Sequence, residues 1–147
     1  MKLEQQVVSL ELAKKMKELG FEQESLWYWV TDDLGLTYLS IDSMGSVMHS
    51  RNSTRVPNYG RPEDYGWRVV EELYSAYTVA EFGEMLPRLQ GYNLIYTGEH
   101  RGGKFCCFYQ KSGFGDDFPI GTELCKADTE ADARAKTLIY LKQKKLI

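Results

Sequence analysis

The residues best suited to metal binding in this chain are two histidines and three cysteines, namely His49, His100, Cys106, Cys107 and Cys125. A structural zinc site needs about four such ligands, usually with a Cys-x-x-Cys pair or an equivalent spacing. Here two of the cysteines are adjacent, and neither histidine sits in a ligand motif. The sequence therefore predicts no metal site.

Nucleophilic catalysis and phosphate binding have equally little support. No Gly-x-Ser-x-Gly sequence is present to expose a reactive serine, and pairing of a cysteine with a histidine would depend on tertiary geometry. The sequence Gly102-Gly103-Lys104 lacks the spacing of a phosphate-binding loop. The glycines at positions 113 and 115 precede acidic residues rather than a helix. We interpret both glycine pairs as turns and expect no cofactor.

Adjacent acidic residues occur at positions 32–33, 63–64, 71–72 and 116–117. Two carboxylates can work as an acid and a base only where burial or a neighbouring charge separates their pKa values. The sequence around these pairs offers no such apolar burial, so we expect solvated turns and assign no catalytic residue. A non-enzymatic role is favoured, and enzymatic activity is left open.

Length and composition are those of an ordinary globular protein. The chain has 147 residues, of which 43% are apolar and 27% charged, and its net charge is −3. We expect one domain over residues 1–147. The chain has no apolar run of about 20 residues for a membrane span, no signal-peptide core and no basic tail beyond a helix end at 142–145. These features predict a cytoplasmic protein with free thiols and disfavour membrane and nucleic-acid partners.

The clearest helix signal is a capping box in the middle of the chain. Thr78 can cap the helix while Glu81 reaches back to the cap amide. Tyr77 and Phe82 stand at the positions of a hydrophobic staple. We expect this helix to end near Met85, because Pro87 follows.

Two further helices are predicted near the ends of the chain. The first begins at Leu10, is capped by the preceding serine, and ends at Gly20. The last is capped by Asp128 or Thr129 and runs to about Lys144. Its apolar residues lie at helical spacing, so we expect one face to pack on a sheet.

Two β-hairpins are predicted from apolar and aromatic runs that flank turn residues. The first joins residues 26–30 and 36–41, and the second joins 92–99 and 104–111 through a glycine-containing turn. Strands and helices do not alternate as in parallel βαβ units. We therefore predict an α+β fold whose antiparallel sheet packs against N-terminal, middle and C-terminal helices.

The segments between these elements carry weaker patterns. Residues 42–66 are rich in polar residues, glycine, proline and tyrosine, and we expect a long irregular loop with room for one short strand. Residues 67–76 show helical spacing, with an extended conformation as the alternative. A short strand is expected near 119–124, before the last helix.

Several of these blocks occur together in one group of proteins. They are residues 9–20, 23–29, 76–87 and 127–141. In them the chain resembles a family of short uncharacterised proteins found in bacteriophages, prophages and the bacteria that carry them. The resemblance implies a common fold and a phage-related setting, and it implies no reaction. Residues 42–66 lie outside it.

Aromatic and arginine side chains, the types that most often anchor protein interfaces, are concentrated in the middle of the chain. The candidate binding residues are Trp29, His49, Arg51, Tyr59, Arg61 and Trp67. The sequence thus favours a phage- or prophage-type accessory protein that binds a host or phage protein without catalysing a reaction.

Two alternative functions follow from other features. A tyrosine-lined pocket with His100 or a cysteine would make a small-molecule, nucleotide-binding or enzymatic domain. The segment 11–29 is also similar to the opening of a winged helix-turn-helix, a nucleic-acid-binding regulator. However, its would-be recognition segment, 23–29, contains no arginine or lysine and is rich in aromatic residues that suit a strand.

Overall fold

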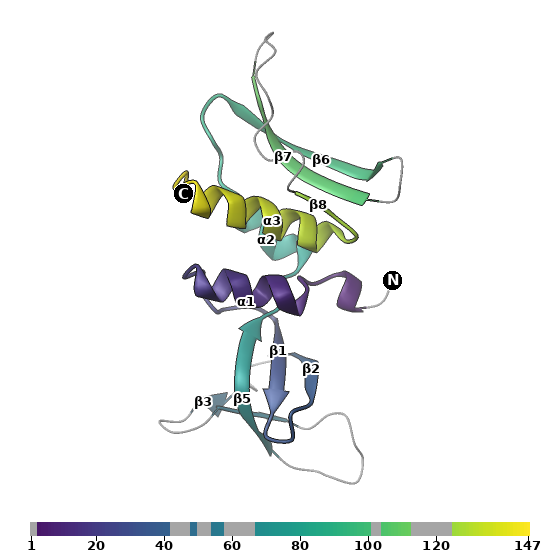
Figure 1. The fold of residues 1–147 in the computed structure, drawn as a ribbon, viewed down its shortest axis with the longest axis vertical. Coiled ribbons are helices and arrows are strands. Elements are labelled where there is room, and N and C mark those ends of the chain that lie inside the picture. Colours follow the sequence, from purple (N-terminus) through teal and green to yellow (C-terminus); the bar gives the residue numbers. More distant parts are fainter. Residues whose placement is uncertain (1–2, 42–47, 50–53, 58–66, 101–103, 113–124) are drawn as a thin grey trace.

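The protein places its α-helices between two antiparallel sheets (Figure 1). The computed structural model describes residues 3–41, 48–49, 54–57, 67–100, 104–112 and 125–147. In chain order the elements are η1 (Leu3–Gln5), α1 (Leu10–Glu18), β1 (Trp27–Asp32), β2 (Thr37–Ile41), β3 (Met48–His49), β4 (Thr54–Pro57), β5 (Trp67–Ser75), α2 (Val79–Met85), β6 (Tyr92–His100), β7 (Lys104–Lys111), β8 (Lys126–Ala127) and α3 (Glu130–Gln143). The predicted α+β class is confirmed.

The two predicted hairpins are present, and each belongs to a different sheet. One sheet has the strand order β2-β1-β5-β4-β3, and the other has the order β6-β7-β8. All strand pairs in both sheets are antiparallel. A sequence pattern identifies neighbouring strands well, but the assignment of hairpins to sheets depends on the packing of the helices between them.

Residues 67–76 form strand β5, so the helical prediction was wrong and the extended alternative is correct. The strand pairs with β1 on one side and with β4 on the other, with Val30 opposite Leu73 and Arg55 opposite Val69. Pairing with a strand on each side stabilises the extended conformation, and this outweighs the helical periodicity of the sequence, which rested on few residues. Within 42–66 the described residues form two short strands, β3 and β4, where one was expected. The strand expected at 119–124 lies outside the described residues.

The capping box of α2 is confirmed in detail. The Glu81 amide donates to the Thr78 hydroxyl at 3.2 Å, and the Thr78 amide donates to the Glu81 carboxylate at 2.7 Å. The staple is present as well, with 5.6 Å between the ring centroids of Tyr77 and Phe82. As predicted, α2 ends at Met85. The capping box and the staple fix the N-terminal end of a helix of only seven residues.

The start of α1 is held by a different contact from the one that the sequence suggested. Ser9 occupies the cap position, but its side chain makes no capping hydrogen bond. Instead its backbone amide donates to Asp132 Oδ1 at 2.7 Å. At the other end Gly20 takes a φ of 78°, and the Phe21 amide bonds the Met16 carbonyl at 3.1 Å. This is a Schellman motif, which requires a left-handed residue at the glycine position.

Lysine side chains fasten α1 to β5. Lys17 Nζ donates to the Leu73 carbonyl at 2.9 Å and lies 4.9 Å from the centroid of the Tyr74 ring. Lys14 Nζ lies 5.3 Å from the same centroid and 3.5 Å from the Glu72 carboxylate. These exposed contacts are individually weak, and they cover the tyrosine ring with two lysine side chains.

Helix α3 is buried on more than the one face that its sequence pattern predicted. Thr129 is its cap, since the Asp132 amide donates to the Thr129 hydroxyl at 3.2 Å. The helix contacts β7, β8, α1 and α2. Its buried residues are Ala131, Ala133, Ala135, Thr137, Leu138, Ile139 and Leu141. The alanines leave room for neighbours on both sides, so α3 separates the two sheets.

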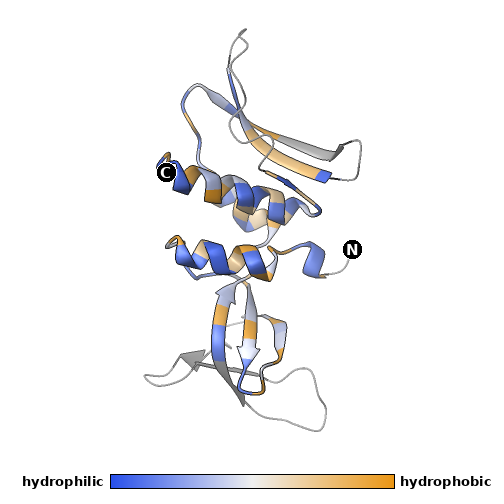
Figure 2. Ribbon diagram, in the orientation of Figure 1, coloured by the Kyte–Doolittle hydropathy of each residue, from blue (hydrophilic) through white to orange (hydrophobic). Residues whose placement is uncertain are grey.

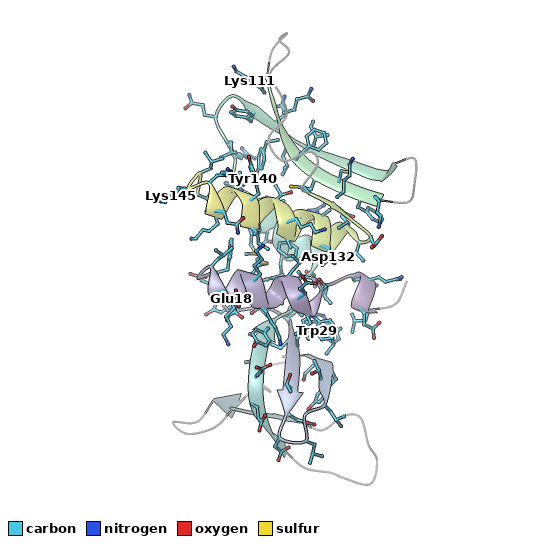
Figure 3. The ribbon with its side chains drawn as sticks, in the orientation of Figure 1. Glu18, Trp29, Lys111, Asp132, Tyr140 and Lys145 are labelled. Carbon is cyan, nitrogen blue, oxygen red and sulfur yellow. The ribbon has the colours of Figure 1, made fainter. Side chains whose placement is uncertain are left out.

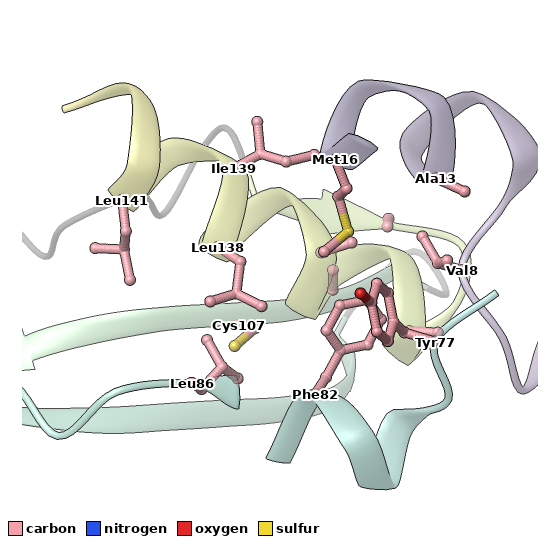
Figure 4. Packing of buried hydrophobic residues seen from close by; sticks show 14 of the residues in the cluster. Val8, Ala13, Met16, Tyr77, Phe82, Leu86, Cys107, Leu138, Ile139 and Leu141 are labelled. Atoms are coloured by element: carbon pink, nitrogen blue, oxygen red, sulfur yellow. The ribbon is translucent and has the colours of Figure 1, made fainter. Parts of the chain in front are cut away.

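The main core forms around α3 and draws side chains from every layer. Figure 4 shows Met16 of α1 beside Ile139, with Leu138 above Cys107 and the rings of Tyr77 and Phe82 packed together. Figure 2 shows hydrophilic and hydrophobic residues interspersed along α1 and α3. A second, smaller cluster lies on the five-stranded sheet around Tyr28 and Val30.

The two helix caps lead to a stability prediction. The substitution Thr78→Ala should lower the free energy of unfolding by about 1 kcal/mol, because it removes the acceptor for the Glu81 amide. The matched substitution Ser9→Ala should cost clearly less, because the Ser9 side chain makes no capping bond. Urea unfolding followed by circular dichroism measures both. Equal losses would contradict this account of the caps.

A second stability prediction concerns the end of α3. Lys145 has a φ of 56° in the Schellman position, where the Leu146 amide bonds the Leu141 carbonyl at 2.9 Å. Glycine avoids the steric cost of that conformation, so Lys145→Gly should raise the free energy of unfolding by about 0.5–1 kcal/mol. The control Lys144→Gly, at a φ of −85°, should bring no gain. Thermal unfolding of the two variants distinguishes these outcomes.

Candidate interaction surface

The structure places three of the six candidate binding residues on separate strands. Trp29 lies in β1, His49 in β3 and Trp67 in β5. Arg51, Tyr59 and Arg61 lie outside the described residues.

Trp29 is held by the interior of the protein. Its indole Nε1 donates to the Val8 carbonyl at 2.8 Å, and its ring packs against the main core. Figure 3 shows it below α1, at the end of β1 that meets the helices. We therefore assign Trp29 a structural role, in which it ties the N-terminal segment to the sheet, and leave it out of the interaction surface.

Trp67 lies at the opposite end of the same sheet. Strand β5 begins at Trp67, which pairs with Pro57, and Asp32 at the end of β1 is opposite Val70. The β1–β2 turn therefore lies beside the first residues of β5, away from the helices (Figure 1). We call this end of the five-stranded sheet, formed by residues 33–36, Pro57 and Trp67, the distal end.

The chain connectivity links two of the remaining candidates, Tyr59 and Arg61, to the residues at this end of the sheet. Tyr59 and Arg61 belong to the segment 58–66, which joins Pro57 to Trp67. Arg51 belongs to the segment 50–53, which joins β3 to β4 at the pair formed by His49 and Thr54. Since Thr54 is opposite Val70 and Pro57 is opposite Trp67, the β3–β4 connection leaves β4 at the end away from Pro57. The predicted surface at the distal end thus depends on β4 and β5 and does not include Arg51 or His49.

The distal end carries two exposed leucines that the sequence reasoning missed. Leu34 is 59% exposed and Leu36 is 47% exposed. Large apolar side chains held in water are candidates for contact with a partner. The signal in the sequence is a pair of leucines around a turn glycine, at positions where polar residues are usual. The sequence pattern predicts only a turn at 32–35 and a strand that begins at Leu36.

A buried carboxylate holds this turn in one conformation. Asp32 is 3% exposed, and its Oδ1 accepts from the Leu34 amide at 2.9 Å and from the Leu36 amide at 3.0 Å. Gly35 takes a φ of 75°, and its amide donates to the Asp32 carbonyl at 2.9 Å. The two leucines are therefore presented on an ordered backbone, which lowers the entropy cost of binding.

The thiols are poor candidates for nucleophilic chemistry. All three cysteines are free and buried. Burial raises the pKa of the Cys107 thiol to about 11, although contact with the Thr137 hydroxyl opposes the shift. Burial also raises the pKa of Cys125. A thiol with such a pKa holds its proton at neutral pH, so the reactive thiolate is scarce.

Other chemistries have no site among the residues that the structure describes. Within them, no group of three His, Cys, Asp or Glu side chains is arranged to hold a metal ion. No described helix is long and apolar enough to cross a membrane. Residues 27–32 form β1, so the segment compared with a recognition helix is a strand in its second half.

Comparisons with known proteins found no protein similar to this chain. No protein-family model matches the chain, and no curated protein and no solved structure shows significant similarity to it. The resemblance to phage and prophage proteins therefore stays a prediction from the sequence.

The raised pKa of Cys107 predicts a loss of stability at high pH. The unfolded thiol ionises near its ordinary value of 9.0, whereas the folded thiol keeps its proton up to about 11. Between these values only the unfolded chain has lost the proton. This group should therefore lower the free energy of unfolding by about 1.4 kcal/mol per pH unit.

Urea unfolding at pH 9, 10 and 11 measures this slope. The variant Cys107→Ala should show a shallower fall than the wild type, whatever its stability at neutral pH. Identical slopes for the wild type and Cys107→Ala would contradict the assignment.

Proposed function

We propose that this protein is a non-enzymatic accessory protein of the phage or prophage type, which acts in the cytoplasm by binding a host or phage protein through its distal end. The proposal rests on one observation above all. Leu34 and Leu36 are exposed on a turn that the buried Asp32 carboxylate holds in place.

The surroundings of these leucines support a protein as the partner. The exposed leucines lie at the same end of the sheet as Trp67 and the start of the segment that carries Tyr59 and Arg61. Leucine, tryptophan, tyrosine and arginine together provide apolar contact area with polar groups at its edge, as protein interfaces do. A net charge of −3 favours a protein partner over nucleic acid.

The proposal predicts a partner whose binding depends on the distal end. Tagged protein is used to capture partners from the host bacterium, and the partner that appears at equal stoichiometry is purified and titrated. The double substitution Leu34→Ser and Leu36→Ser should weaken the affinity by at least about tenfold, because two apolar contacts are lost. Changing Tyr59, Arg61 and Trp67 together should weaken it as well.

The matched control is Leu26→Ser. Leu26 is 60% exposed, but it lies at the other end of β1, where its amide donates to Glu81 Oε1 at 3.2 Å. This variant should bind as the wild type does. Equal weakening by Leu26→Ser, or full affinity after the changes at the distal end, would overturn the proposal. So would a retained metabolite in place of a protein.

A further inference from the structure

The register of the three-stranded sheet brings two distant cysteines together. Strands β7 and β8 pair in antiparallel fashion, with Phe105 opposite Ala127 and Cys106 opposite Lys126. One more step along the same register sets Cys107 opposite Cys125. Directly opposed residues of antiparallel strands have Cα atoms about 4.5–5.5 Å apart. A disulfide needs about 4.4–6.8 Å between Cα atoms, so the backbone suits one.

The two cysteines share one buried environment under α3. Cys107 is 1% exposed and Cys125 is fully buried. The Thr137 hydroxyl donates to the Cys107 carbonyl at 2.7 Å, which places this part of α3 directly over the pair. Figure 4 shows the Cys107 side chain directed into the core beneath Leu138. Opposed residues on neighbouring strands point to the same face of the sheet, so the Cys125 side chain should lie in the same buried environment under α3.

We propose that Cys107 and Cys125 are a site of reversible oxidation, which forms an intramolecular disulfide when a small-molecule disulfide is present. The Cys125 thiolate attacks one sulfur of that disulfide, and a mixed disulfide forms as the first small thiol leaves. The Cys107 thiolate then attacks the Cys125 sulfur and releases the second small thiol. The two cysteine protons pass to the two leaving thiolates, and the oxidant is reduced by two electrons.

The slow step of this reaction is exposure of Cys125. Burial protects both thiols in the closed fold, so the first attack requires local opening. Strand β8 has two residues and lies at the edge of its sheet, and both features favour its local opening. Closure of the bond then links β7 to the chain just before β8 and closes the loop of residues 108–124, which reduces the freedom of the unfolded chain.

The test uses the full chain, reduced first and then incubated with oxidised glutathione. The expected product has lost two hydrogen atoms by intact mass, and its peptide map links Cys107 to Cys125. Its midpoint of thermal unfolding should rise by several degrees, and dithiothreitol should restore the starting value. Urea below the unfolding transition should speed the reaction, because it favours local opening of β8.

Variants separate this pair from the remaining thiol. Cys106→Ser should oxidise as the wild type does, whereas Cys107→Ser and Cys125→Ser should not lose two hydrogens. The peptide map of the wild type shows which two cysteines are bonded, even if a variant fails to fold. A bond that involves Cys106, glutathione adducts that persist as the end product, or a chain still reduced in sub-denaturing urea would each overturn the proposal.

Discussion

The structure depends on the burial of α3 on two sides at once. Its small residues Ala131, Ala133 and Ala135 let neighbours approach closely, and Leu138 and Leu141 fill the space between the layers. A helix packed on both sides must have few bulky polar groups near its axis. The polar group that it does bury, the Thr137 hydroxyl, bonds backbone carbonyls of Cys107 and Ala133. The two sheets are separated because this helix occupies the space between them.

Polar contacts around α3 join the helices to one another. The Asp132 carboxylate accepts the Ser9 amide, so one negative charge lies near the N-termini of α1 and α3 and complements both helix dipoles. Arg134 bonds Glu130 on its own helix and the Val79 carbonyl of α2 at 3.2 Å. The three helices are thus connected by specific hydrogen bonds as well as by apolar packing.

This arrangement leaves the five-stranded sheet projecting from the helices. Trp29 and Tyr74 meet the core at the end of the sheet beside α1, while the β1–β2 turn lies at the other end (Figure 1). A projecting sheet with an ordered tip can reach a partner without disturbing the core. The three-stranded sheet differs, since α3 covers one face of it and encloses the thiols. Among the described residues, the exposed leucines of the β1–β2 turn and the buried thiols therefore lie in different sheets.

The sequence by itself determined the local elements, because their signals are contained within a few residues. The box formed by Thr78 and Glu81, the staple beside it and the turn glycines each act over one turn of chain. The candidate binding residues stay a prediction: the sequence pattern names Trp67, Tyr59 and Arg61, gives no signal for a contact at Leu34 and Leu36, and does not show that Trp29 bonds the Val8 carbonyl.

Tertiary structure alone decided what depends on distant partners. The strand conformation of residues 67–75 needs β1 and β4 beside it, and the division into two sheets needs α3 between them. The start of α1 is held by Asp132, which lies 123 residues away in the chain and accepts a hydrogen bond from the Ser9 amide. The expected cap by the Ser9 side chain does not form. The proximity that we infer for Cys107 and Cys125 extends the register of β7 with β8 by one residue. Pairing and packing free energies add up over many distant contacts, and no local pattern encodes them.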